Sequence, residues 1–218
     1  MVDKKTIPRI LHSIWVGDKP KPIKLMQTWK DKHPDYKFFE WNNETVRKMK
    51  FRCQKQIDQM WGVGRFNGVA DLIRYEVLYE FGGFVAPADS VCLNPIDDLL
   101  EYGMGFCCYE NEKVRPDLLS PHLGVAAGNF YFDVMIKGLM KTVDVLYADP
   151  WITTGNKFLT DAVKLTGYPI KILPSYTFIP EHYTGEIYAG NGKIYAKHFW
   201  GGTKGIINNL DDQLILNK

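Results

Sequence analysis

The sequence predicts an α/β protein with a mostly parallel sheet, and two observations lead to this prediction. In the first 50 residues, β-rich runs alternate with helical segments, which is the pattern of a parallel-sheet core. Residues 67–98 then combine a helix, a glycine pair, a short apolar strand and an isolated acid, Asp89. An acid at the carboxyl end of a sheet strand lies where open α/β sheets bind ligands.

The elements of the first half follow from local patterns of apolar, capping and turn residues. We expect strands at 7–16, 36–41 and 84–86. We expect helices from Pro22 to before His33, after an N-cap at Asn43, within 51–66, and over 68–81 between an Asn67 cap and Gly82-Gly83.

The second half is predicted in the same way. Strand-like runs occupy 90–93, 104–109, 122–127, 169–173 and 193–199, and helices are expected after Pro95, at about 130–146 and at 155–165. Residues 117–129 have an open sequence, and we expect them to line a ligand site. Because neither a linker nor an internal repeat divides the 218 residues, we predict a single domain over 1–218.

Composition excludes some functions. The net charge is only +2 and the basic residues are dispersed, so the basic stripe of a nucleic-acid binder is missing. No apolar run approaches the roughly 20 residues that cross a bilayer, and no apolar signal core follows the first basic residues. The four cysteines fit neither a zinc pattern nor a disulfide framework, which predicts buried thiols. We expect a soluble, cytoplasmic protein.

Three groups of polar residues are candidates for a site. Asp71 and Arg74 share one helix face, and their spacing alone favours a local surface ion pair over a ligand contact. Asp89 is either a turn cap or one carboxylate ligand of a divalent cation. His198 and Trp200 lie on one side of a strand end, where the simpler interpretation is a buried histidine beside a core tryptophan.

Taken together, these segments resemble glycosyltransferase family 32, the group with a DXD sugar-binding region that is related to the catalytic domains of the large clostridial glucosylating toxins. The resemblance rests on IPRILHSIW (7–15), WKDKHPDYKFFEW (29–41), DLIRYEVLYEFGGFVAPAD (71–89) and HFW (198–200). These segments occur in the order of the family and cover nearly the whole chain.

The resemblance implies a GT-A type fold, with a Rossmann-like, mixed and mostly parallel sheet flanked by helices. It implies a nucleotide-binding part at about 1–93 and an acceptor-side part at about 94–218. The donor-binding residues that it implies are Trp15, His12, Asp71, Arg74, Ala88, Asp89, His198 and Trp200. Asp89, Arg74 and Trp200 are the expected catalytic residues, and Asp89 and His198 the expected ligands of Mn²⁺ or Mg²⁺.

The implied activity is the metal-dependent transfer of a sugar from a nucleotide-diphosphate sugar, with a UDP-sugar favoured, to a hydroxyl of a glycan or small acceptor. Retention of the anomeric configuration is implied as well. The expected partners are a nucleotide-sugar donor and a glycan or small acceptor. We expect no nucleic-acid partner and no segment that spans a membrane. We expect a cytoplasmic enzyme of bacterial or viral type.

The chain departs from the family pattern at two positions. Pro87 stands where the first Asp of DXD is expected, and Val85 stands where the family has Tyr. One alternative is therefore a catalytically degenerate relative that binds a nucleotide sugar or glycan without turnover. A second alternative is an inverting transferase with an acid such as Asp117 as its base.

Overall fold

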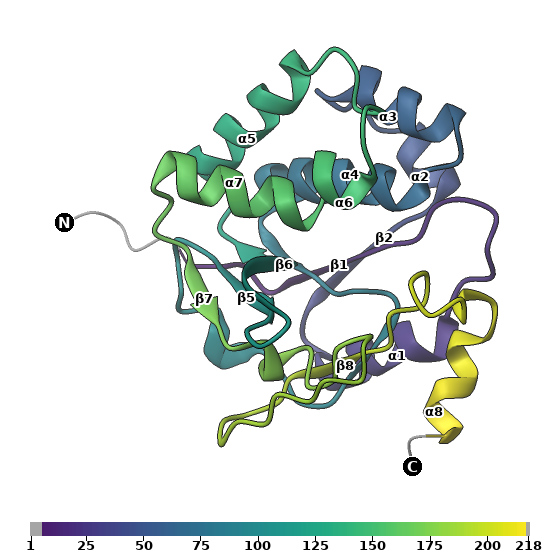
Figure 1. The fold of residues 1–218 in the computed structure, drawn as a ribbon, viewed down its shortest axis with the longest axis vertical. Coiled ribbons are helices and arrows are strands. Elements are labelled where there is room, and N and C mark those ends of the chain that lie inside the picture. Colours follow the sequence, from purple (N-terminus) through teal and green to yellow (C-terminus); the bar gives the residue numbers. More distant parts are fainter. Residues whose placement is uncertain (1–5, 217–218) are drawn as a thin grey trace.

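A six-stranded sheet forms the centre of the molecule (Figure 1) in the computed structural model, which describes residues 6–216. Its order is β2-β1-β3-β6-β5-β7, and β6 pairs antiparallel with both of its neighbours while the other pairs are parallel. The predicted mixed, mostly parallel sheet is therefore confirmed. The strands are β1 Ile10–Ile14, β2 Lys37–Trp41, β3 Gly83–Val85, β5 Phe106–Asn111, β6 Arg115–Val125 and β7 Lys171–Leu173.

Helices lie on both sides of this sheet (Figure 1). One side carries α2 Asn43–Arg47, α3 Gln54–Gly62, α4 Phe66–Phe81, α5 Phe130–Lys141, α6 Pro150–Thr153 and α7 Asn156–Thr166. The other side carries α1 Ile23–Lys32, a two-stranded ribbon of β4 Ser90–Cys92 and β8 Ala196–His198, and the C-terminal α8 Gln213–Leu216. Short 3-10 turns occupy Asp97–Leu99, Ser175–Thr177 and Ile207–Asp212.

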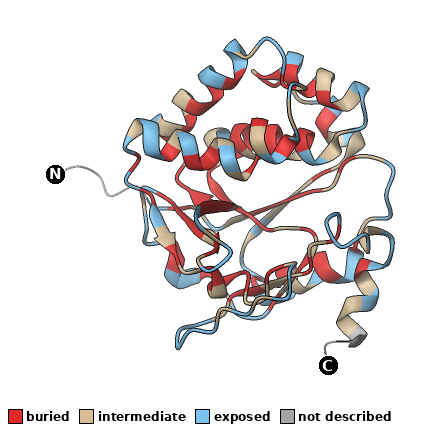
Figure 2. Ribbon diagram, viewed as in Figure 1, coloured by how far each residue is buried: buried red, intermediate tan, exposed pale blue. Residues whose placement is uncertain are grey.

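Each face of the sheet packs against its own apolar core, and the buried residues follow the strands and the inner sides of the helices (Figure 2). Successive side chains of a strand point to opposite faces, so Cys107 belongs to the core under α4 and Cys108 to the core beside α1. All four cysteines lie within the described residues, and they are buried and free, as predicted.

The glycine pair after α4 is required by close backbone packing. Gly82 and Gly83 have φ values of 64° and 99°, in the region that favours glycine. A Cβ on Gly83 would lie 2.5 Å from the carbonyl oxygen of Ile10, so no side chain fits between β3 and β1. The predicted end of the helix is correct, and it delivers the chain directly into β3.

Three local predictions are wrong. The cap of α2 is Asn42, whose side chain accepts from the N–H groups of Glu44 and Thr45, whereas the Asn43 amide bonds across to the backbone of Gly17. Asn67 does not cap α4, because this helix already begins at Phe66 without a side-chain cap.

The strand expected at 122–127 begins earlier, because β6 spans Arg115–Val125 and pairs with β3 and β5, so residues 117–121 are strand as well. Proline and glycine obscure the strand pattern in the sequence. Among residues 6–216 no helix has the length and apolar character needed to span a bilayer.

The N-terminus of α1 is capped from the far end of the chain. Pro22 precedes the helix and provides no side-chain cap. The carboxylate of Asp211 instead accepts from the backbone N–H of Lys24 at 3.0 Å and from that of Leu25 at 3.1 Å. A negative charge at a helix N-terminus satisfies free N–H groups and interacts favourably with the helix dipole. Asp211 therefore ties the C-terminal segment to α1.

We expect Asp211→Ala to lower the free energy of unfolding by about 1 kcal/mol, because helix caps contribute about 0.5–2 kcal/mol. Chemical denaturation measures this loss. Asp212→Ala is the matched control, since Asp212 is exposed and next in the chain. Equal stability of the two variants would show that the Asp211 cap contributes nothing.

Candidate active site

Asp89 lies in the turn between β3 and β4, and the end of β8 contacts it directly. Its Oδ2 accepts from the backbone N–H of Gly201 at 3.0 Å, and its Oδ1 lies 3.4 Å from Nδ1 of His198. Its own carbonyl accepts from the N–H of Phe199 at 2.9 Å. These contacts continue the β4–β8 ladder, in which Ser90 pairs with His198. The structure therefore joins the two motifs that carry Asp89 and His198.

Trp200 follows in a backbone conformation that bulky residues rarely adopt, with φ at 59°. Its indole N–H donates to the carbonyl of Glu181 at 3.0 Å. Its ring packs edge-on against His198, His182 and Tyr183, with centroid distances of 4.7, 5.1 and 5.3 Å. Trp200 is thus fixed between the β8 end and the segment around His182.

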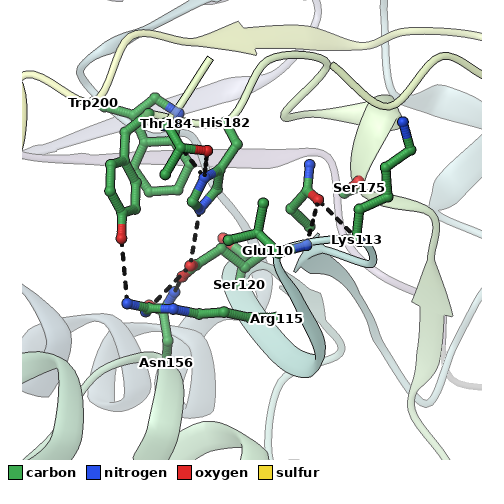
Figure 3. A network of polar contacts seen from close by, with 12 residues as sticks. Glu110, Lys113, Arg115, Ser120, Asn156, Ser175, His182, Thr184 and Trp200 are labelled. Carbon is green, nitrogen blue, oxygen red and sulfur yellow. Dashed lines mark hydrogen bonds and ion pairs between the residues drawn. The ribbon is translucent and has the colours of Figure 1, made fainter. Parts of the chain in front are cut away.

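A buried carboxylate, Glu110 at the end of β5, supports this segment (Figure 3). It accepts from the Asn156 amide at 2.5 Å, and it lies 3.3 Å from both His182 and Arg115. Arg115 also donates to the hydroxyl of Tyr183 at 3.2 Å. Sequence analysis assigned no role to these residues, because their proximity depends on which strands are neighbours and leaves no local signal.

Asp71 and Arg74, both on α4, form an ion pair at 2.5 Å. The spacing favoured a surface pair, but Asp71 is only 8% exposed, and its second oxygen accepts from the hydroxyl of Thr154 at 3.3 Å. Burial raises the pKa of Asp71, and the Arg74 guanidinium opposes this shift. A buried pair of this kind is costly to break, so it holds the two side chains in fixed positions.

His122 on β6 is a site residue that sequence reasoning missed. It is 3% exposed, its Nδ1 lies 2.8 Å from the Ser120 hydroxyl, and its ring centroid lies 5.5 Å from that of His198. Burial lowers the pKa of His122 well below its usual value, and the charges of His198 and Arg74 lower it further. The ring is therefore neutral at pH 7. Residues 117–129 were expected to line the site, but nothing in the local pattern singled out this histidine.

Three buried nitrogens, at and around His122, have no hydrogen-bond partner among the described residues. They are Nε of Arg74, Nε2 of His122 and Nδ1 of His198, and they come from α4, β6 and β8. Most buried polar atoms in proteins are hydrogen-bonded, because an unpaired one costs its lost hydration. Three such atoms in one neighbourhood indicate a place for a polar ligand.

The remaining predicted donor residues lie elsewhere. His12 is fully buried, with Nε2 2.8 Å from the Gly82 carbonyl and Nδ1 accepting from the Trp41 indole at 3.1 Å. Burial lowers its pKa to about 4. Both ring nitrogens of His12 are therefore occupied within the sheet, and its role in donor binding stays a prediction.

Trp15 is half-buried at the end of β1. Its indole N–H donates to the carbonyl of Lys19 at 3.0 Å, and its ring packs with a small apolar cluster of Leu25, Phe199 and Leu210. Ala88 is buried in the same turn as Asp89. Donor binding by Trp15 and by Ala88 stays a prediction.

The residues around Asp89 fit a divalent cation only in part. Asp89 and His198 present an oxygen and an unpartnered nitrogen 3.4 Å apart, whereas Pro87 provides no ligand. Among residues 6–216, no group of three His, Cys, Asp or Glu side chains could hold a metal ion. Ions such as Mg²⁺ are commonly bound by one or two carboxylates together with substrate phosphates. Such an ion would need the donor to complete its ligands.

Part of the sequence matches a known protein family. A family model described as a glycosyltransferase sugar-binding region containing a DXD motif matches residues 20–104. This segment includes the ion pair of Asp71 and Arg74, as well as Asp89.

The chain is also similar to yeast mannosyltransferases. It is 29% identical over 167 residues to inositol phosphoceramide mannosyltransferase 3 of Schizosaccharomyces pombe, covering 71% of this chain and 44% of the relative. It is 27% identical over 113 residues to the initiation-specific alpha-1,6-mannosyltransferase of Candida albicans, covering 44% and 28%. The chain thus spans less than half the length of these relatives.

Two solved structures share the fold. The PaToxG glycosyltransferase has a TM-score of 0.59 at 14% identity, covering 74% of this chain and 70% of that one. The UDP-bound glycosyltransferase domain from the YGT toxin has a TM-score of 0.56 at 8% identity, covering 78% and 80%. The predicted GT-A type fold is confirmed.

The prediction of a cytoplasmic protein is wrong. The finding that overturns it is the similarity to inositol phosphoceramide mannosyltransferases and to a mannosyl phosphorylinositol ceramide synthase of Saccharomyces cerevisiae, enzymes named for ceramide lipids. Net charge and the lack of a long apolar run could not reveal this.

The family match, the mannosyltransferase relatives and the shared fold agree with the four sequence segments that carried the resemblance. Residues 20–104 therefore match the family whose sugar-binding region contains the DXD motif, and the chain is similar to mannosyltransferases in sequence and to glycosyltransferase domains in fold.

Proposed function

We propose that the chain transfers a sugar from a nucleotide-diphosphate sugar, with a UDP-sugar favoured, to a hydroxyl of a glycan or glycolipid acceptor. One observation carries the proposal. Asp89 contacts His198 after the end of β3, the ring of His122 packs against that of His198, and Arg74, His122 and His198 each have a buried nitrogen without a partner. In this proposal residues 1–93 bind mainly the nucleotide and residues 94–218 form the acceptor side.

The chemistry requires stabilisation of the negative charge that develops on the departing diphosphate. Arg74 supplies a fixed cation, held by its ion pair with buried Asp71. His198 supplies a second nitrogen, and Trp200 closes this side of the site. Preorganised groups of this kind act more strongly in a site that excludes water than in solution.

A divalent cation, Mn²⁺ or Mg²⁺, belongs to the proposal, and Asp89 and His198 are the residues that would hold it. When bound, the cation supplies positive charge to the diphosphate. Pro87 leaves the protein one carboxylate short of the DXD pattern.

Retention of the anomeric configuration is proposed from the family resemblance. The inverting alternative named Asp117 as a base, but this side chain is 84% exposed and lies 3.5 Å from Lys164. Asp71 and Glu110 are buried and engaged in ion pairs. These positions provide no support for a carboxylate base, and the departing phosphate oxygen is the proposed proton acceptor.

A screen of UDP- and GDP-sugars, with and without Mn²⁺, tests the proposal through nucleotide release. GDP-sugars belong in the panel because the relatives are mannosyltransferases, and UDP-sugars because one structural neighbour binds UDP. We expect turnover with at least one donor. Folded protein that releases nucleotide from none of them would refute the proposal.

A non-catalytic relative is the second candidate, and Pro87 and Val85 motivate it. It predicts nucleotide binding that neither Mn²⁺ nor Asp89→Ala changes, together with no hydrolysis. Calorimetry and the donor screen together separate it from the enzyme.

We expect Asp89→Asn to lower kcat/KM by about 100-fold, the scale reported for removal of one electrostatic stabilising group. Asparagine keeps an oxygen that accepts from Gly201 N–H, so the change removes charge while preserving the contact. The control is Asp31→Asn, an exposed acid on α1 that bonds to Gln27. Activity within twofold of wild type for Asp89→Asn would remove Asp89 from the mechanism.

We expect Glu110→Ala to lower the free energy of unfolding by about 2 kcal/mol, because it leaves buried donors on Asn156 and His182 without their acceptor. Activity should fall as well, since Trp200 loses the support of His182.

The control for this prediction is Glu186→Ala. Glu186 forms an exposed pair with Lys113, and such pairs contribute about 0–1 kcal/mol. Denaturation curves and donor hydrolysis measure both variants. If Glu110→Ala behaves like Glu186→Ala, the network does not hold the Trp200 segment.

A further inference from the structure

One polar atom of the site has no function in the chemistry described so far. His122 is almost fully buried, and Ser120 occupies its Nδ1 at 2.8 Å. Nε2 has no partner. A purely structural position would be filled at lower cost by an apolar ring, because an unpaired buried polar atom is destabilising.

Strand pairing relates the position of this ring to that of the altered motif. β3 and β6 pair antiparallel, with Gly83 opposite Val125 and Phe84 opposite Gly124. His122 lies two residues before Gly124 on β6, and Pro87 lies three residues after Phe84, just beyond the end of β3. Because the two strands are antiparallel, both positions lie toward the same end of this strand pair.

The ring also faces the donor side of the sheet. It packs against Phe178 with a centroid distance of 5.2 Å and against His198 at 5.5 Å. Phe178 belongs to the core on the α1 and β8 side, the side on which the β8 end contacts Asp89. The ring of His122 thus contacts one residue of the core, Phe178, and one residue of the candidate site, His198.

The unpartnered Nε2 of His122 is suited to hydrogen-bond a hydroxyl. An imidazole nitrogen is a donor in one tautomer and an acceptor in the other, and a hydroxyl can satisfy either. The Arg74 guanidinium, in contrast, provides donors and a positive charge, which suit phosphate oxygens.

We propose that Nε2 of His122 hydrogen-bonds a hydroxyl of the transferred sugar on the side where Pro87 has no carboxylate, and that His122 thereby helps to select the donor sugar. This proposal rests on the proposed function, because it requires a nucleotide sugar in the site. The ligand is the sugar part of the donor, and the diphosphate is left to Arg74, Asp89 and His198.

Calorimetry with UDP, GDP, UDP-glucose and GDP-mannose tests the proposal on the full chain. For the sugar nucleotide that wild type binds, we expect His122→Ala to weaken binding about 5–10-fold, the loss of one hydrogen bond. Binding of the matching nucleotide diphosphate should change less than twofold. His122→Gln, which keeps a donor and an acceptor, should restore part of the loss.

His33→Gln is the matched control. His33 is a buried histidine whose Nδ1 lies 2.8 Å from the Trp29 carbonyl and whose Nε2 accepts from Ile96 N–H at 3.0 Å. Its replacement should lower stability and leave the ratio of the two affinities unchanged. A loss of stability alone therefore cannot imitate the expected result.

If His122→Ala leaves the ratio of the affinities for sugar nucleotide and nucleotide diphosphate unchanged, the proposal is overturned. The activity of wild type would still stand in that case. Wild-type protein that binds none of the four probes would instead overturn the proposed function, and the sugar contact with it. If the variants do not fold, the imidazole ¹⁵N spectrum of wild type decides. The Nε2 signal of His122 should move with the sugar nucleotide and not with the diphosphate, and the opposite result overturns the proposal.

Discussion

The pairing of β4 with β8 is the interaction on which the candidate site depends. Asp89 immediately precedes β4, and His198 ends β8, so the ladder of Ser90 with His198 sets their separation. More than 100 residues lie between the two strands, and closing so long a loop costs conformational entropy. The buried neighbours of the ribbon offset this cost, since Cys92 and Ala196 belong to the core beside α1. Backbone pairing of β4 with β8 therefore sets the separation of Asp89 and His198 in the candidate site.

Local elements of this fold could be predicted because their causes lie close in the sequence. Pro22 marks the start of α1, and Gly82 marks the end of α4, in both cases for steric reasons that need no distant partner. Capping was less predictable. Asn42 and Asn43 are both suitable caps, and contact with Gly17, far from them in sequence, decides which one performs that role. The cap of α1 comes from Asp211, which no local pattern could show.

The candidate site divides in the same way. Asp89, His198 and Trp200 could be named because they stand in segments that resemble a family. Glu110 and His122 could not, because their contacts depend on β6 running antiparallel between β3 and β5. Alternation of strands and helices predicts a sheet but not its strand order. Spacing alone predicts a surface ion pair for Asp71 and Arg74, because spacing on one helix says nothing about what packs over it.

The change from carboxylate to Pro87 has a consequence for how a cation and a donor would bind. With Asp89 and His198 as its protein ligands, a cation would take most of its remaining ligands from phosphate and water. Its affinity for the protein alone would then be weak and its affinity for the protein with donor stronger. If the donor raises the affinity of the protein for the cation by some factor, thermodynamic linkage requires that the cation raise the affinity for the donor by the same factor. A second carboxylate would have filled the metal site in advance and weakened this coupling. In the proposed function, the proline would therefore make the cation and the donor depend on each other for binding.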